Sequence, residues 1–295
     1  MGKYFKLYKI LKCPINIPLN DLDAWSTYPE HRWVYNRLEI ALFQNIECAP
    51  MPILPNKYPI IIKPIINMYG MGLNVLKINN EEEFFNQWHN NNFWMEFLEG
   101  DHLSFDIILN NGQILYNSCF KGHKNEDFVG KFDYWESLDI DNNNLPKIIY
   151  KLIDEHFKNF YGCLNVEIIG DKIIECHLRM GDIDKFPILE ILKGIIKVYE
   201  KDGLNYDWSK INVCKLFFFP IWIKKDVVDK KLFKFLKKKI SPLLEKNQYI
   251  CEYEIDDDSL ATPCQEKRVM WFTTYAKEYG DEIKKSIFNE LSFFL

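Results

Sequence analysis

The chain of 295 residues is 47% hydrophobic and 27% charged, a composition typical of a globular protein with one large domain or two modest ones. Its formal net charge of −5 repels phosphate backbones, which argues against a general nucleic-acid binder. The eight cysteines form no C-x-x-C pair, so we expect reduced thiols in a cytoplasmic protein and no zinc site. We find no signal-peptide pattern, and the longest apolar run, 216–223, is too short to span a bilayer.

The first third of the chain predicts short elements separated by proline and glycine. Prolines make residues 1–30 irregular, and apolar residues at helical spacing predict a helix over 31–45. Strands are predicted at 58–62 and 73–78, on either side of a glycine-bearing turn. Asn80, followed by three glutamates, is typical of a helix start.

The middle of the chain predicts a sheet with covering helices. Its predicted strands are 93–98, 103–109 and 113–120, with a turn at Asn111-Gly112 between the last two. Residues 121–137, with Lys121, Lys124 and Lys131, are predicted to form a loop, either one that closes over a substrate or an ordinary connection. A helix at 145–160, a strand–turn–strand at 164–179 and a helix at 188–201 follow.

The last part of the chain predicts a small α+β unit. Its expected elements are strands at 214–223, 249–255 and 268–275 and helices at 226–240 and 279–291. The lysine run at 234–239 lies in one of these helices and is predicted to be a solvated face.

The strand–turn–strand segment carries the polar groups that indicate chemistry. Alternation places Asn165 and Glu167 on one face of the first strand, and Glu175, His177 and Arg179 on one face of the second. A three-residue loop would set Glu167 opposite Glu175 and keep the other face apolar. A two-residue turn would shift the pairing by one and scatter the polar groups, so we prefer the odd loop.

Two adjacent carboxylates repel each other unless a cation lies between them. Glu167 and Glu175 therefore predict a Mg²⁺ site, since this ion prefers a few oxygen ligands together with phosphate or water. The alternative is a solvated hairpin face with an ion pair between Arg179 and Glu175.

A second segment has features of a phosphate site. Lys63 ends an apolar strand, and Gly70 and Gly72 follow in a turn where the backbone can approach phosphate oxygens closely. The segment is neither a Walker loop nor a G-x-G-x-x-G motif. A structural hairpin is the alternative interpretation.

In this order and spacing, the segments resemble the ATP-grasp superfamily over roughly residues 31–182. The matching pieces are Lys63-Pro64, the loop 67–72, the hinge 94–100, Glu167 and the strand 175–179. The resemblance implies an α+β fold in which two lobes, 31–100 and 101–210, hold ATP between them. It leaves 1–30 as a reduced N-terminal segment and 211–295 as an additional α+β unit.

The resemblance also implies roles for individual residues. ATP would be held by Arg37, Lys63, Gly70, Gly72, Met95, Glu96, Phe97, Leu98 and His102. Mg²⁺ would be held by Glu167, Glu175 and His177, although His177 stands where the family usually has Asn. Lys63 and Arg179 would act in catalysis, Arg179 by stabilising the transferred phosphoryl group or an acyl phosphate.

The implied activity is that of an ATP- and Mg²⁺-dependent ligase. ATP would convert a carboxylate to an acyl phosphate, and an amine or a thiol would then displace the phosphate. The substrates would be small molecules or peptides. The alternatives are an ATP-grasp kinase or phosphotransferase, a non-catalytic nucleotide-binding module, and an interaction protein that binds no ATP.

Overall fold

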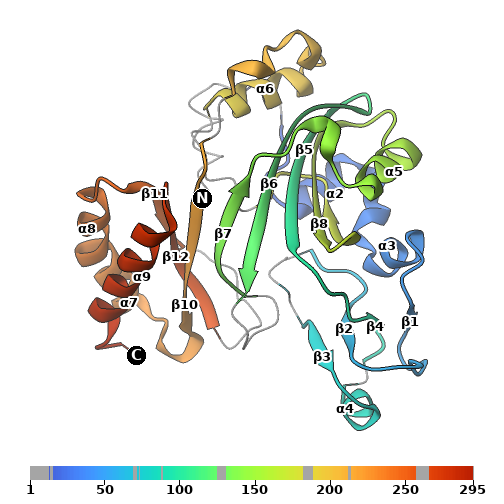
Figure 1. Ribbon diagram of the computed structural model, residues 1–295, viewed down its shortest axis with the longest axis horizontal. Coiled ribbons are helices and arrows are strands. Elements are labelled where there is room, and N and C mark those ends of the chain that lie inside the picture. Colours follow the sequence, from blue (N-terminus) through green and yellow to red (C-terminus); the bar gives the residue numbers. More distant parts are fainter. Residues whose placement is uncertain are drawn as a thin grey trace. The chain divides into compact units, whose positions relative to one another are not determined.

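The computed structural model describes residues 13, 16–68, 72, 74–87, 89–124, 131–181, 189–211, 214–256 and 266–294. Its internal contacts divide the chain into two units (Figure 1). The first unit is Met1–Lys121 with Leu138–Asn212, and the second is Gly122–Ser137 with Val213–Leu295. The domain limits predicted from the sequence stay predictions. The contacts add that 122–137 belongs with the C-terminal unit.

Residues 21–43 of the first unit form three short helical segments. They are α2 (Asp21–Thr27), the 3₁₀ helix η1 (Pro29–Tyr35) and α3 (Arg37–Phe43). The continuous helix predicted over 31–45 is therefore wrong. Asn36 interrupts it, because its backbone is extended and its side chain accepts hydrogen bonds from the first turn of α3.

The helix α2 also corrects the prediction that residues 1–30 are irregular. Asn20 caps this helix, and its side-chain oxygen accepts a 2.9 Å hydrogen bond from the backbone N–H of Asp23. Two aspartates lie in the first turn, where the helix dipole favours negative charge. The acidic cluster after an asparagine is thus a helix start that the proline-based interpretation overlooked.

A small antiparallel sheet follows, with strand order β1-β4-β2-β3. Its strands are β1 (Cys48–Pro50), β2 (Ile60–Pro64), β3 (Leu76–Ile78) and β4 (Asn92–Glu96). The helix α4 (Glu81–Asn86) follows β3, and Asn80 caps it as predicted by accepting a hydrogen bond from the Glu83 N–H. Ile60, Ile62, Phe84 and Trp94 form part of the core beneath this sheet.

A second group of strands in the first unit has the order β6-β5-β8-β9. These strands are β5 (His102–Asn110), β6 (Gln113–Lys124), β8 (Tyr161–Ile169) and β9 (Lys172–His177). The predicted turn at Asn111-Gly112 is confirmed, because both residues take positive φ values of 54° and 75°. The helix α5 (Lys147–His156) buries Ile149 and Leu152 in the core of these strands (Figure 1). The helix α6 (Leu189–Tyr199) also contacts β8.

The β8–β9 hairpin combines the two alternatives that the sequence left open. Its turn has only two residues, because Ile169 pairs with Lys172, so the predicted three-residue loop is wrong. A β-bulge at Ile174 then shifts the register by one residue and sets Glu167 opposite Glu175. The predicted pairing is therefore confirmed. The bulge also lets β9 keep its apolar side chains in the core on both sides of the irregularity.

The second unit contains strands in the order β11-β12-β10-β7. They are β7 (Phe132–Leu138), β10 (Phe217–Lys224), β11 (Ile250–Ile255) and β12 (Glu266–Thr274). The helical segments are α7 (Lys230–Phe235), a π-helical turn (Leu236–Ile240), α8 (Ser241–Glu245) and α9 (Lys277–Leu291). The predicted α+β character of this region is confirmed, with shifts of a few residues at the element ends.

The loop predicted over 121–137 is wrong. β6 continues to Lys124, and β7 begins at Phe132, so much of the segment forms strands. The ring of Tyr134 stacks on His123 at a centroid distance of 4.2 Å, and Trp135 is buried. Lysines and glycines concealed these strands in the sequence, because their pairing is decided by aromatic packing within the second unit.

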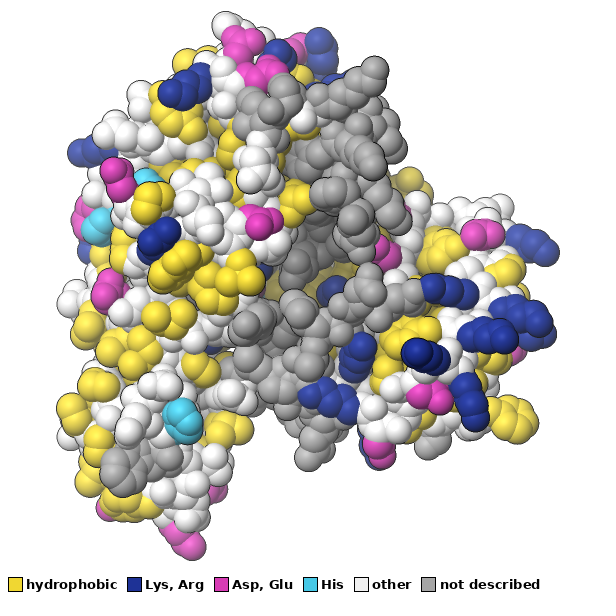
Figure 2. All heavy atoms as spheres, turned by 180° about the vertical axis from the view of Figure 1, so that it is seen from behind, with side chains coloured by type: hydrophobic (Ala, Val, Ile, Leu, Met, Phe, Trp, Pro, Cys, Tyr) yellow, Lys and Arg dark blue, Asp and Glu magenta, His cyan; other side chains and the backbone are white. Residues whose placement is uncertain are grey.

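The lysine run is solvent-exposed, as predicted. Lys234, Lys237, Lys238 and Lys239 are exposed, while Leu236 and Ile240 between them are buried. Figure 2 shows many lysine and arginine side chains gathered on the second unit. No helix in the described parts of the chain is long and apolar enough to cross a bilayer.

The backbone of the hairpin turn after β8 packs against the backbone of the segment that follows β4. Gly170 has a φ of +61°, and its N–H donates to the carbonyl of Asp101 at 3.0 Å. A Cβ atom at Gly170 would lie 2.8 Å from the carbonyl oxygen of Glu99. Both the left-handed conformation and the close approach therefore require glycine.

Replacing Gly170 by alanine should lower the free energy of unfolding by about 2 kcal/mol. Alanine disfavours the left-handed φ at this position, and its Cβ atom would collide with the Glu99 carbonyl oxygen. Urea denaturation of purified protein measures this change. The control is Asp171→Ala, an exposed residue in the same turn, which should change stability by less than about 0.5 kcal/mol. Equal stability of the two variants would contradict the argument.

Candidate functional site

The polar face of β5, β8 and β9 gathers side chains in two rows that cross the three strands. In one row Asp106 pairs with Asn165, which pairs with His177. In the next row Ser104 pairs with Glu167, which pairs with Glu175. Residues directly opposite each other on neighbouring strands share a face of the sheet, so Glu167 and Glu175 are neighbours. We call this face of β5, β8 and β9 the polar wall.

Glu175 is neutralised by two cationic side chains. Arg37 Nη2 donates a hydrogen bond to Glu175 Oε1, and His177 Nε2 lies 3.3 Å from the same oxygen. Burial alone would raise the pKa of this carboxyl, but Arg37 and His177 outweigh it and hold the pKa of Glu175 well below its usual range. Glu175 is therefore an anion held on the wall by groups from α3 and β9.

Glu167 has a different partner and is the more open of the two carboxylates. Its Oε2 lies 3.0 Å from His102 Nε2, and its side chain is 27% exposed, against 13% for Glu175. His102, which the resemblance places near the nucleotide, is itself buried beside this carboxylate. The pair leaves one side of Glu167 accessible to a ligand.

Lys63 is a buried ammonium at the end of β2. Its Nζ donates a 3.0 Å hydrogen bond to the carbonyl oxygen of Ile174, the bulge residue, and lies 5.6 Å from the Phe93 ring centroid. Burial, helped by the nearby Arg37 charge, lowers the pKa of Lys63 from 10.5 to about 7, against the pull of Glu175 and Glu167. The β-bulge thus supplies the carbonyl that anchors this lysine.

Arg37 has a buried donor atom that the described residues leave without an acceptor. Its Nη1 atom is buried and has no hydrogen-bond partner among the described residues. A buried guanidinium nitrogen without an acceptor is costly, and a phosphate oxygen is an acceptor that would satisfy it. Arg37 and Lys63 therefore fit the phosphate groups of ATP.

The two carboxylates also fit Mg²⁺, within limits. No group of three or more His, Cys, Asp or Glu side chains in the described part of the chain is arranged to hold a metal ion. Mg²⁺ commonly takes only one or two protein carboxylates and fills its remaining positions with phosphate and water oxygens. Glu167 and Glu175 would then hold the ion together with a bound nucleotide.

His177 and Arg179 share a partner that sequence reasoning missed. Asp21 Oδ1 lies 2.9 Å from His177 Nδ1, and Asp21 Oδ2 accepts a 2.9 Å hydrogen bond from Arg179 Nη2. Burial would raise the pKa of Asp21, but His177 and Arg179 outweigh it and lower that pKa. The sequence signal was only the acidic first turn of a helix, and it says nothing of partners 156 and 158 residues away.

Both ring nitrogens of His177 face carboxylate oxygens, one of Asp21 and one of Glu175. Burial and Arg179 lower the pKa of His177, yet the two carboxylates prevail and raise it to about 9. In this arrangement the ring is a cation that bridges two anions. Its predicted contact with a metal stays a prediction.

The predicted adenine hinge lies beside the strand that carries Lys63. Met95 pairs with Ile61 of β2 and is buried, while Glu96 donates its backbone N–H to the Glu47 carbonyl at 2.8 Å. Lys77 Nζ lies over the ring of Phe97, 4.3 Å from the ring centroid. Leu98 packs against a small core cluster of Ala41, Ile46, Phe93 and Met95.

The glycine loop is only partly placed. Gly72 has a φ of +62°, the left-handed region that glycine favours, whereas Gly70 lies outside the described residues.

Of the residues predicted from the sequence, the structure brings together Arg37, Lys63, His102, Glu167, Glu175 and His177. Arg179 is joined to them through Asp21.

Comparison with known proteins supports the fold. No protein-family model matches the sequence, and no curated protein matches it significantly. Among solved structures, an L-amino acid ligase from Bacillus licheniformis superposes with a TM-score of 0.60 at 10% identity, over 97% of this chain and 75% of that one.

Two further structures superpose over most of the chain. A carboxyaminoimidazole ribonucleotide synthase from Aspergillus clavatus, complexed with ATP, gives a TM-score of 0.60 at 9% identity, over 91% of this chain and 75% of that one. An N5-carboxyaminoimidazole ribonucleotide synthetase from Thermotoga maritima gives 0.53 at 12% identity, over 97% and 77%. The chain has the ATP-grasp fold, as its sequence predicted.

Replacing Lys63 by methionine should raise the free energy of unfolding by about 1 to 4 kcal/mol at pH 7, because an apolar side chain of similar length relieves the burial of a charge. The pKa of Lys63 is lower in the folded protein than in the unfolded chain. The buried ammonium therefore destabilises the fold by its full amount below pH 7, and this destabilisation disappears as the pH rises from about 7 to 10.5. The gain of the variant should shrink over that range.

Urea titrations of both proteins at several pH values measure this difference. The exposed Lys57, replaced in the same way, is the matched control and should change stability by less than about 0.5 kcal/mol. A Lys63→Met variant less stable than the original protein at pH 7 would show that the lysine stabilises the fold.

Proposed function

We propose that this chain is an ATP- and Mg²⁺-dependent ligase that activates a carboxylate as an acyl phosphate for attack by an amine or a thiol. One observation carries the proposal. A buried lysine and a buried arginine with an unused donor lie beside two adjacent carboxylates on one wall of the first unit. The similarity to an L-amino acid ligase and to a synthase complexed with ATP supports the same conclusion.

In this proposal the phosphates of ATP lie against Lys63 and Arg37. Arg37 would turn its Nη1 to a phosphate oxygen, and Lys63 would neutralise charge through the ammonium that donates a hydrogen bond to the Ile174 carbonyl. Bound Mg²⁺, held by Glu167 and Glu175, would neutralise charge on the phosphates during transfer. The hinge 95–98, Gly70, Gly72 and His102 would hold the rest of the nucleotide.

The chemistry then runs in two balanced steps. A substrate carboxylate oxygen attacks the terminal phosphorus, so the bond from that phosphorus to ADP breaks and an acyl phosphate forms. An amine next attacks the acyl carbon, the carbon–oxygen bond to phosphate breaks, and the amine proton leaves to solvent. Arg179 would stabilise the negative charge that develops on the acyl phosphate. No side chain of the protein acts as a covalent nucleophile.

The reaction class distinguishes this proposal from its alternatives. A kinase or phosphotransferase would leave a stable phosphorylated product, whereas a ligase releases phosphate and forms an amide or thioester. A nucleotide-binding module would bind ATP without releasing ADP. A screen of ADP release with Mg²⁺ against amino acids and peptides, followed by mass spectrometry of the products, separates these outcomes.

Replacing Glu175 by glutamine should lower the rate of ADP release at least about 100-fold, since the wall loses a metal-binding anion and Arg37 loses its partner. Circular dichroism should show that the variant still folds. Glu82→Gln, a change of an exposed carboxylate on α4, serves as the control and should keep full activity. Unchanged turnover in Glu175→Gln would refute the metal-site assignment.

A further inference from the structure

We infer that Asp21 of helix α2 is a positioning residue, which holds the guanidinium of Arg179 in place on the polar wall, beside the ring of His177. The part that Arg179 plays in turnover rests on the proposed function. The way in which Arg179 is held rests on geometry alone. This gives helix α2 a place in the candidate site that the sequence did not indicate.

The first argument is the geometry of the carboxylate. Asp21 is 3% exposed, and each of its two oxygens contacts a different cation at 2.9 Å. Arg179 is itself buried, and its Nη1 donates a 2.8 Å hydrogen bond to the carbonyl of Met180. A planar guanidinium held at two nitrogens from different directions has little freedom to rotate. Asp21 therefore defines the orientation of Arg179.

The second argument is the continuity of the charges. Arg37 contacts Glu175, Glu175 contacts His177, His177 contacts Asp21, and Asp21 contacts Arg179. Positive and negative groups alternate along this chain, so each charge is compensated by its neighbours. Removing the Asp21 charge would leave the buried guanidinium of Arg179 without its carboxylate partner. Arg179 would then lose its fixed orientation.

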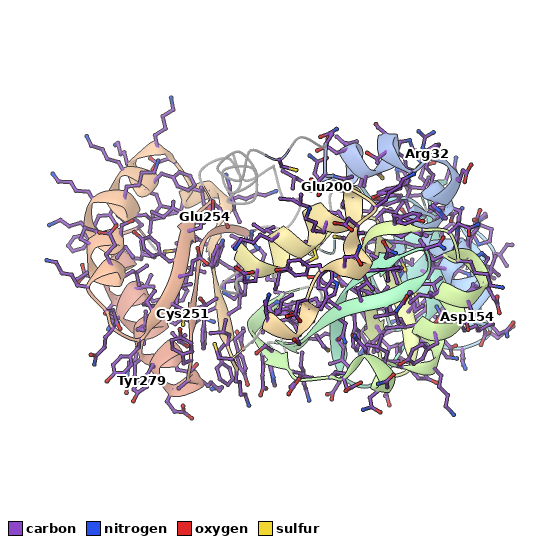
Figure 3. All side chains as sticks on the ribbon, turned by 90° about the horizontal axis from the view of Figure 1, so that it is seen from above. Arg32, Asp154, Glu200, Cys251, Glu254 and Tyr279 are labelled. Atoms are coloured by element: carbon purple, nitrogen blue, oxygen red, sulfur yellow. The ribbon has the colours of Figure 1, made fainter. Side chains whose placement is uncertain are left out.

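The third argument is the rigidity of the support. Ala24 of α2 is fully buried, and the ring of Trp25 packs on Tyr35 at a centroid distance of 5.7 Å. Tyr35 in turn accepts a 3.3 Å hydrogen bond from the backbone N–H of Leu178, between His177 and Arg179. Arg32, labelled in Figure 3, donates from Nε to the carbonyl of Trp25 at 2.7 Å. These contacts attach α2 to the end of β9.

A purely stabilising role for Asp21 makes a different prediction. It would lower stability in a variant without changing the orientation of Arg179 or the turnover of folded protein. The test therefore compares Asp21→Asn, which keeps the shape but removes the charge, with Asp23→Asn. Asp23 lies in the same helix, is exposed, and accepts a 2.8 Å side-chain hydrogen bond from its neighbour Asn20.

The first measurement does not require activity. In nitrogen-labelled full-length protein, the side-chain N–H signals of Arg179, identified by their loss in Arg179→Lys, should be slowly exchanging. They should be broadened or lost in Asp21→Asn and retained in Asp23→Asn. Retention in folded Asp21→Asn would overturn the inference, whether or not the protein turns over ATP.

The second measurement concerns turnover of ATP with Mg²⁺ and any substrate that stimulates ADP release. Asp21→Asn should lower kcat about 10- to 100-fold, because a misplaced group loses the alignment that the transition state needs. The dissociation constant for ATP, measured by calorimetry, should change less than about twofold, since Lys63 and Arg37 keep their places. An equal loss in ATP affinity would instead indicate general disruption.

A double variant separates action through Arg179 from an independent effect. If Asp21 acts through Arg179, adding Asp21→Asn to Arg179→Lys should lower kcat no further. Multiplicative losses would overturn the inference while leaving the proposed function intact. Absence of ADP release from the unaltered protein would refute the proposed function, and the Arg179 signals would still decide the positioning role.

Discussion

The candidate site depends on the placement of two carboxylates side by side on neighbouring strands. Glu167 and Glu175 pair directly across β8 and β9, which like charges would normally oppose. The fold tolerates this pairing because each carboxylate has a cationic or ionisable neighbour of its own, His102 for Glu167 and Arg37 with His177 for Glu175. The negative charge of the two carboxylates is thus compensated by side chains of the protein itself.

Arg37 and Lys63 are buried beside these carboxylates in arrangements that lower the stability of the fold. Both are buried, one with an unsatisfied nitrogen and the other with a strongly lowered pKa. Neither arrangement is favourable for stability alone, since buried charges and unpaired donors are expensive. Their presence beside adjacent carboxylates is the pattern expected of a site that binds an anion together with a metal ion. The proposed ATP site explains both unfavourable features by one ligand.

The hairpin shows how a local preference and a global constraint can both be met. The Gly170-Asp171 pair forms the two-residue turn that the local sequence favours, and this turn alone would have put Glu175 on the wrong face. The bulge at Ile174 restores the pairing, and its carbonyl accepts the hydrogen bond from Lys63. One irregularity therefore sets the register and anchors a residue of the candidate site.

The sequence by itself determined the α+β class and the Asn80 helix cap, and it predicted the pairing of Glu167 with Glu175, although through a three-residue loop instead of the two-residue turn and bulge that the structure has. These features depend on residues close together in the chain and on alternation along a strand. It also predicted the ATP-grasp fold through the order of several weak motifs. It failed at 121–137, where two strands are held by packing within the second unit, and at 31–45, where Asn36 caps a new helix.

Only the tertiary structure decided which charges meet. Arg37 and Glu175 are 138 residues apart, and Asp21 lies 156 and 158 residues from His177 and Arg179. A local pattern cannot specify such partners, because each side chain by itself is an ordinary surface charge. Once these charged side chains are buried on the same face of the sheet, each must be paired with an opposite charge, because an unpaired buried charge is strongly unfavourable.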